Sequence, residues 1–128
     1  GDHRDLHLSI RRQRQMCIRD RLEALAPNYD LIVIDTLIAG LSGRADENSN
    51  TAMGSIANDL AAIARRSNAA ICLLHHTSKG TSDDIFHTIR GASALRGAYD
   101  VGMLLERRKG EREALLHVEG KDIEGGSF

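Results

Sequence analysis

The chain has 128 residues, of which 41% are hydrophobic and 3% aromatic, so it fits one globular domain whose core is built from aliphatic side chains. Its formal net charge of −1 argues against an isolated nucleic-acid binder driven by phosphate neutralisation. Cys17 and Cys72 lie in unrelated contexts, and no apolar run approaches the roughly 18 residues of a membrane span. We therefore expect a cytoplasmic protein with neither a disulfide framework nor a membrane segment.

The N-terminal segment differs from the rest in charge. Residues 1–21 hold six arginines and three aspartates, whereas the remaining 107 residues hold 11 basic and 15 acidic side chains. The stretch RRQRQMCIRDR at 11–21 resembles translated sequencing-adapter read-through, which predicts that residues 1–21 are non-native. The alternative is a basic amphipathic segment that binds nucleic acid or an acidic surface. Both ends of the chain look cut, so we expect residues 22–128 to be a domain truncated at both ends.

The first predicted elements are a helix end, a strand and a long helix. Residues 22–26 are typical of the end of a helix that Pro27 stops. Residues 31–34, all aliphatic and mostly β-branched, predict a strand covered on both faces, and such strands are usually parallel. After a predicted loop at 36–50, apolar residues recur at three- and four-residue steps over 51–67. This spacing predicts an amphipathic helix, capped by Ser49 or Asn50.

A second apolar strand is predicted at 69–74, so strand, helix and strand predict a right-handed βαβ unit. Residues 77–89 are predicted as a loop and 92–99 as a short helix. Two further strands at 101–107 and 113–118 are expected to form a hairpin with Gly110 at its tip. The fold class is therefore α/β, with a mostly parallel sheet, flanking helices and a C-terminal β-hairpin, and half a sheet of this kind leaves an apolar face uncovered.

Polar residues follow both predicted parallel strands. Asp35 follows the first strand, and His75 and His76 follow the second. Ligands of open parallel sheets bind beyond the carboxyl ends of the strands, so these side chains are candidates for one site. Asp35 either organises magnesium in a nucleotide-hydrolysing enzyme or caps the following loop.

The histidines and a nearby arginine each leave several interpretations open. A histidine at a strand end can bind a metal, act as an acid or base, or sense a phosphate. Because adjacent strand residues point to opposite faces, His75 and His76 are poorly placed to share one zinc ion, and His75 also fits a hydrogen-bonded core histidine. Arg90, directly after the predicted loop, is either a finger that reaches a neighbouring subunit or a solvated surface arginine.

An ordered set of motifs carries a family resemblance. The segments LIVIDTL, the helix from ADENSN to ARRS, ICLLHHTSKG, IRGASALRGAYDVGMLLE and HVEGKDIEG resemble the RepA-type branch of RecA-like ATPases. That branch contains hexameric replicative helicases and many AAA-type ATPase relatives. The resemblance covers residues 28–124 and implies that residues 22–128 form the C-terminal half of a RecA-like core.

The resemblance also implies roles for single residues. By position in the motifs, Asp35 resembles the Walker B carboxylate that holds magnesium through water, and His76 resembles the sensor of the γ-phosphate, with His75 as its nucleotide-binding neighbour. Arg90 is similar to the arginine finger that acts across the subunit interface. Lys121 resembles a second trans-acting cation, although the related pattern has a basic residue where Ile123 stands. Lys79 falls in the segment that lines the nucleic-acid channel of helicase members.

The implied cofactors are ATP and Mg²⁺, and the implied partners are further copies in a hexamer and single-stranded DNA. The sequence contains no G-x-x-x-x-G-K-[ST] phosphate-binding loop, and the strand with the family's catalytic glutamate would lie upstream. We therefore expect a fragment of an ATP-driven motor on DNA that is inactive alone. The alternatives are a non-catalytic RecA-like module for oligomerisation or partner binding, and a metal hydrolase that uses the histidines.

Overall fold

The structure is a computed structural model that describes residues 19–37, 49–80 and 82–128. Most of the predicted non-native segment 1–21, most of the predicted loop 36–50, and Cys17 lie outside these residues. The described elements follow one another in this order: η1 (Ala26–Asn28), β1 (Leu31–Ile34), α3 (Asn50–Ser67), β2 (Ala70–Leu73), η2 (Ile85–Thr88), α4 (Ala92–Arg96), β3 (Val101–Glu106), β4 (Leu115–Gly120) and β5 (Gly126–Ser127).

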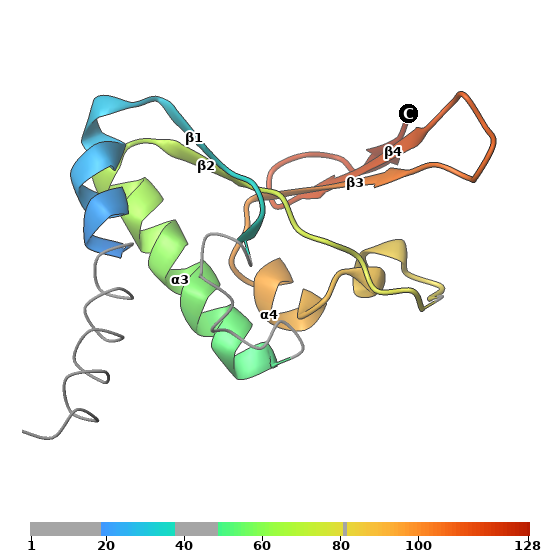
Figure 1. The fold of residues 1–128 in the computed structure, drawn as a ribbon, viewed down its shortest axis with the longest axis horizontal. Helices are drawn as coiled ribbons and strands as arrows, with labels where there is room; N and C mark the ends of the chain where they lie inside the picture. The colour runs from blue at the N-terminus through green and yellow to red at the C-terminus, as the bar shows by residue number, and fades with distance from the viewer. Residues whose placement is uncertain (1–18, 38–48, 81) are drawn as a thin grey trace, which may run out of the picture.

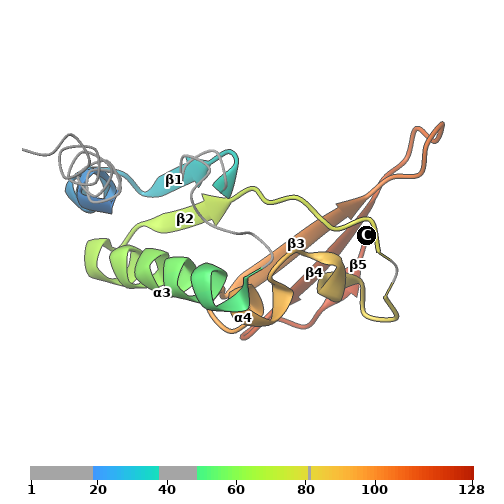
Figure 2. The same cartoon turned by 60° about the horizontal axis from the view of Figure 1, so that its bottom comes forward.

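Strands β1 and β2 are parallel neighbours joined through α3, which confirms the predicted βαβ unit. Leu31 is paired with Ala70, and Ile34 with Leu73. Figures 1 and 2 show α3 lying along one face of this pair. Since the two strands run in the same direction, their carboxyl ends meet at one edge.

Helix α3 has clear start and stop signals. The Oγ of Ser49 accepts a hydrogen bond from the backbone N–H of Ala52 at 3.2 Å, which satisfies one of the unpaired donors of the first turn. The helix ends at Asn68, whose left-handed backbone (φ 56°) closes the last turn, and Arg65 and Arg66 lie favourably at the negative end of the helix dipole. Ser49 is therefore the cap among the two predicted candidates.

The main core lies between α3 and its neighbours. Met53 of α3 is fully buried, and Leu37 and Leu95 pack in the same cluster, so this core joins the end of β1, α3 and α4. The opposite face of β1 is different, because Leu31 and Val33 are each 57% exposed. Among the described residues, the sheet is thus covered on one face, and the predicted cover on both faces is wrong for this part of the chain.

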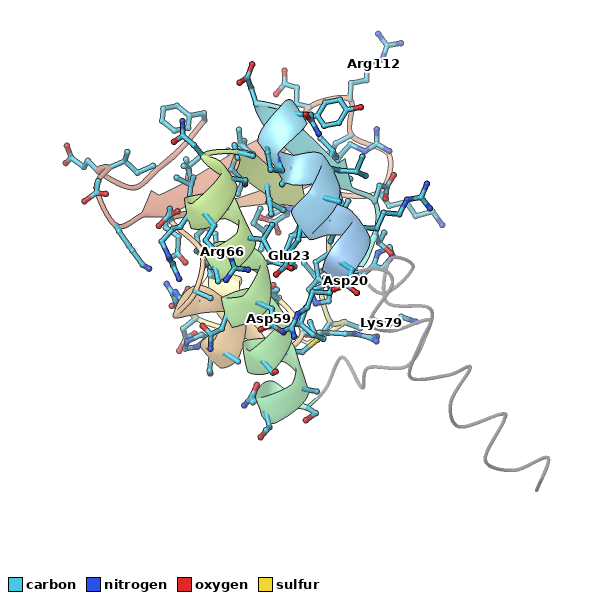
Figure 3. All side chains as sticks on the ribbon, turned by 90° about the vertical axis from the view of Figure 1, so that its left-hand side faces the viewer. Asp20, Glu23, Asp59, Arg66, Lys79 and Arg112 are labelled. Atoms are coloured by element: carbon cyan, nitrogen blue, oxygen red, sulfur yellow. The ribbon has the colours of Figure 1, made fainter. Side chains whose placement is uncertain are left out.

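The N-terminal helical residues 19–25 pack beside α3, and the α-helix ends at Leu25, one residue before the predicted end. Pro27 lies inside the 3-10 turn η1 that follows it. The Nη2 of Arg66 donates to the Glu23 carboxylate at 2.6 Å, and Figure 3 shows these two side chains pointing toward each other. Arg19 forms an ion pair with Asp59 of α3. All four side chains are well exposed, so these pairs contribute little to stability.

Strands β3, β4 and β5 form a separate antiparallel sheet. The predicted hairpin is confirmed: Gly110 lies in its loop with φ 90°, and Figure 1 shows the loop projecting from the body. Figure 3 shows Arg112 extending from that loop. Strand β4 runs two residues later than the predicted 113–118, because its register is set by pairing with β3. The unpredicted β5 is held by two hydrogen bonds of 2.9 Å between the backbones of Leu116 and Phe128.

The segment between β2 and α4 is more ordered than the predicted loop 77–89. It contains η2, whose N-cap Asp84 accepts a hydrogen bond from the Phe86 N–H at 3.1 Å, and Phe86 itself is buried. Its ends meet in a bridge between Thr77 and Ile89. Helix α4 ends at Arg96, three residues before the predicted end. The predicted α/β class with its C-terminal hairpin is confirmed, with the strands divided between two sheets.

Candidate functional site

The carboxyl ends of β1 and β2 bring the predicted polar residues to one edge. Beyond the paired strands, the Leu74 N–H donates to Ile34 O at 3.0 Å, and the Leu37 N–H donates to Leu74 O at 2.9 Å. These two bonds place Asp35 alongside Leu74, the residue that follows β2 and precedes His75. Asp35 is exposed, so its carboxylate is accessible at this edge.

The two adjacent histidines occupy different environments. His75 is half-buried, and its Nε2 lies 2.9 Å from the backbone oxygen of Arg90. Its Nδ1 is buried and has no hydrogen-bond partner among the described residues. His76 is exposed. The core-histidine interpretation of His75 therefore matches its hydrogen bond, whereas His76 remains accessible for a ligand.

Arg90 lies next to the same edge through its backbone. The bridge between Thr77 and Ile89 and the bond from His75 hold the start of α4 beside the end of β2. Gly91, the N-cap of α4, has φ 69°, a left-handed conformation in which a side chain would be strained. The chain thus turns sharply after Arg90, and the structure brings the Arg90 backbone to the His75 side chain just beyond the end of β2.

The two predicted lysines lie elsewhere. Lys79 is exposed in the segment that follows His76. Lys121 is exposed directly after β4 of the second sheet, where its backbone N–H donates to Asp100 O at 3.0 Å. It lines an open depression of about 190 Å³ together with Arg96 and Tyr99. Lys121 therefore follows a strand of the second sheet, whereas Asp35 and His76 follow strands of the first.

A polar network around Arg96 was not predicted from the sequence. The Arg96 guanidinium donates to Asp84 at 2.7 Å and forms a second, short ion pair with Glu119, which also accepts a hydrogen bond from the Tyr99 hydroxyl. Its guanidinium carbon lies 5.6 Å from the centre of the Phe86 ring, within cation–π range. The network joins η2, α4 and β4, which are well separated in sequence.

The network shifts the pKa values of its members. The hydrogen bond from Arg96 lowers the pKa of Asp84, helped by the Phe86 N–H. The hydrogen bonds to Glu119 and Asp84 raise the pKa of Arg96. Burial raises the pKa of the Tyr99 phenol well above its usual value, and the hydrogen bond to Glu119 adds to this. One guanidinium bridges two carboxylates from distant parts of the chain, so the network fits a structural role.

The donor set at the strand ends fits magnesium better than zinc. In the part of the chain that the structure describes, no group of three His, Cys, Asp or Glu side chains is arranged to hold a metal ion. Mg²⁺ in nucleotide sites is bound by one or two carboxylates, water and the phosphates, so a single exposed carboxylate such as Asp35 is enough on the protein side.

Comparison with known proteins identifies the family. The fold defines an α/β domain with candidate ligand-binding residues at the ends of parallel strands, and a family model described as AAA domain matches residues 5–82. The chain therefore belongs to the AAA domain family, whose members are ATPases that use a nucleotide and Mg²⁺. No curated protein and no solved structure matched the chain. Among the described residues, no helix has the length and apolarity needed to cross a membrane.

Proposed function

We propose that the chain is part of a RepA-type RecA-like motor that couples ATP hydrolysis to movement on DNA. The observation that supports this most is that Asp35, His75 and His76 follow the carboxyl ends of two paired parallel strands, the edge where open α/β sheets bind their ligands. The membership of the AAA domain family supports the use of ATP. The helicase activity, the oligomer and the residue roles are our proposal.

In this proposal the strand ends supply one half of a nucleotide site. Asp35 holds Mg²⁺ through water, as the Walker B carboxylate does, and the ion neutralises charge on the phosphates when it is bound. His76, which is exposed just beyond the end of β2, senses the γ-phosphate. The sequence contains no G-x-x-x-x-G-K-[ST], and the proposal places the phosphate-binding loop upstream of it, where the resemblance to RecA-like ATPases implies it.

The other half of the proposed mechanism acts between subunits. Arg90 is the arginine finger for the site of a neighbouring copy, and Lys121 is a second cation acting in trans. Arg90 lies between η2 and α4, and Lys121 directly follows β4, so the two cations would approach the neighbouring site from separate elements. A hexamer would gather six copies of the segment around Lys79 at a channel for single-stranded DNA, which compensates for the low net charge of each chain.

The decisive experiment uses the full-length protein, encoded by the same gene with its upstream sequence. We expect DNA-stimulated ATP hydrolysis that Asp35→Asn lowers at least about 100-fold, because the substitution removes the charge that organises the metal. Asp30→Asn is the matched control, since Asp30 is exposed at the opposite end of β1 and should lose less than about twofold.

Two further results separate the proposal from a non-catalytic oligomerisation module. Arg90→Ala should leave ATP affinity within about twofold and lower kcat at least about 100-fold, because a finger stabilises transition-state charge. Adding this variant to wild-type rings should lower the activity of neighbouring wild-type subunits. A full-length protein that oligomerises but neither binds nor hydrolyses ATP would establish the non-catalytic alternative.

A further inference from the structure

His75 connects the end of β2 to the segment that carries Arg90. A carbonyl oxygen can only accept, so the contact of 2.9 Å between His75 Nε2 and Arg90 O requires Nε2–H as the donor. The other ring nitrogen, Nδ1, is buried without a partner among the described residues. Leaving a buried acceptor unpaired costs free energy, so packing alone does not favour a histidine at this position.

The path from His75 to Arg90 is closed by further backbone contacts. The Ser78 N–H donates to Thr88 O at 2.6 Å, and Thr77 and Ile89 form a bridge. The segment between Ser78 and Thr88 is therefore a loop whose two ends are paired with each other. The Arg90 backbone is fixed relative to the end of β2 by these contacts on one side and by the turn at Gly91 on the other.

We propose that His75 is a positioning residue for Arg90: its Nε2–H holds the Arg90 backbone beside the end of β2. This inference rests on the proposed function, in which His76 senses the phosphate and Arg90 acts in the neighbouring subunit. His75 then links the sensor His76 to Arg90. The nucleotide bound in one subunit thereby influences the position of the Arg90 that acts on the site of the neighbouring subunit. This role differs from a direct contact of His75 with the nucleotide, which the sequence alone had indicated.

The hydrogen bond is tested first in the 128-residue chain, by amide hydrogen exchange of the peptide covering residues 88–92. His75→Leu removes the donor and keeps an apolar side chain of moderate size, so we expect exchange in this peptide to rise about tenfold while α3 is unchanged. His75→Gln restores an N–H donor and should return exchange toward the wild-type rate. The control is His87→Leu, because His87 is exposed on η2.

Two exchange results would overturn the inference. One is wild-type exchange over 88–92 in His75→Leu. The other concerns a His75→Leu variant that is broadly unfolded, which loss of protection in α3 would reveal. The His75→Gln variant then decides: if its peptide 88–92 exchanges as fast as that of His75→Leu, the Nε2–H donor has no role in holding Arg90.

The link to turnover is tested in the full-length protein. His75→Leu should lower kcat at least about tenfold with the KM for ATP within about twofold, and the double variant with Arg90→Ala should be no slower than Arg90→Ala alone. His75→Gln should recover most of kcat. A raised KM, or an additive loss in the double variant, would mean that His75 contacts the nucleotide and would overturn the inference. If the protein hydrolyses no ATP, the proposed function fails and this link with it, whereas the exchange result still decides whether His75 holds Arg90.

Discussion

The polar residues near the two sheets differ in whether they face solvent or pair with each other inside the fold. At the ends of β1 and β2, Asp35 and His76 are exposed to solvent. Beside β4, by contrast, Arg96 is matched by Asp84 and Glu119 within the fold. A charge matched internally holds elements together, whereas an exposed carboxylate and imidazole at adjoining strand ends are available for a ligand. The comparison therefore separates the region where we propose a ligand site from a region whose charged groups hold elements of the fold together.

The two regions also differ in how deeply they bury apolar side chains. The largest effect on the free energy of unfolding is expected from substituting a methionine in each region. Met53 of α3 is 0% exposed, whereas Met103 of β3 is 62% exposed. We expect Met53→Ala to lower the free energy of unfolding by about 2–3 kcal/mol through lost burial and the cavity left behind, and Met103→Ala to change it by less than about 0.5 kcal/mol. Urea unfolding followed by circular dichroism measures both. An equal loss at Met103 would show that the outer face of β3 is covered, for example in an oligomer.

A smaller effect is expected from the ion-pair network. Arg96→Ala should lower the free energy of unfolding by about 1 kcal/mol, since the pairs are only partly buried and water screens them. Arg96→Lys should lose about half as much, because a lysine keeps the charge but cannot bond both carboxylates with a planar fork. Arg107→Ala, at an exposed site just after β3, is the control in the same urea titration. If Arg96→Ala were as stable as this control, the network would not be a stabilising element.

The smallest effect concerns pH. Because burial and the bond to Glu119 raise the pKa of Tyr99, the protonated phenol is favoured in the folded state. Its stabilising contribution is therefore complete below about pH 10, the usual tyrosine value, and is lost as the pH rises above it toward the raised folded value. Absorbance at alkaline pH should show one tyrosine that ionises late. This component should be missing in Tyr99→Phe, and its persistence there would assign it to Tyr29 instead.

The elements that the sequence predicts well are those with strong local signals. The apolar runs that became β1 and β2 and the spacing of apolar residues in α3 are local patterns, and Ser49 and Gly110 carry the matching cap and turn. The order in which these elements follow one another was enough to predict that Asp35 and the histidines share an edge, because parallel strands place their carboxyl ends together.

The features that the sequence did not predict depend on contacts between distant segments. Arg96 and Glu119 are 23 residues apart, and no pattern in a single sequence pairs them. Strand β5 is made of Gly126 and Ser127, which have low strand propensity, and it exists through its pairing with β4. Within 77–89, Phe86 was the one available signal, since a lone aromatic residue in a polar segment often marks a buried anchor.

The topology also sets an order of assembly. In the β3–β4 hairpin, Glu106 pairs with the nearby Leu115, a local contact that forms on the microsecond scale. In the other sheet, Leu31 must find Ala70 across the whole of α3, and such distant pairings form slowly. Synthesis delivers the segments in the reverse order, because the ribosome releases β1 long before β2. The aliphatic residues of β1 therefore leave the ribosome before the strand that pairs with them, so they stay unpaired on the nascent chain until β2 has been made.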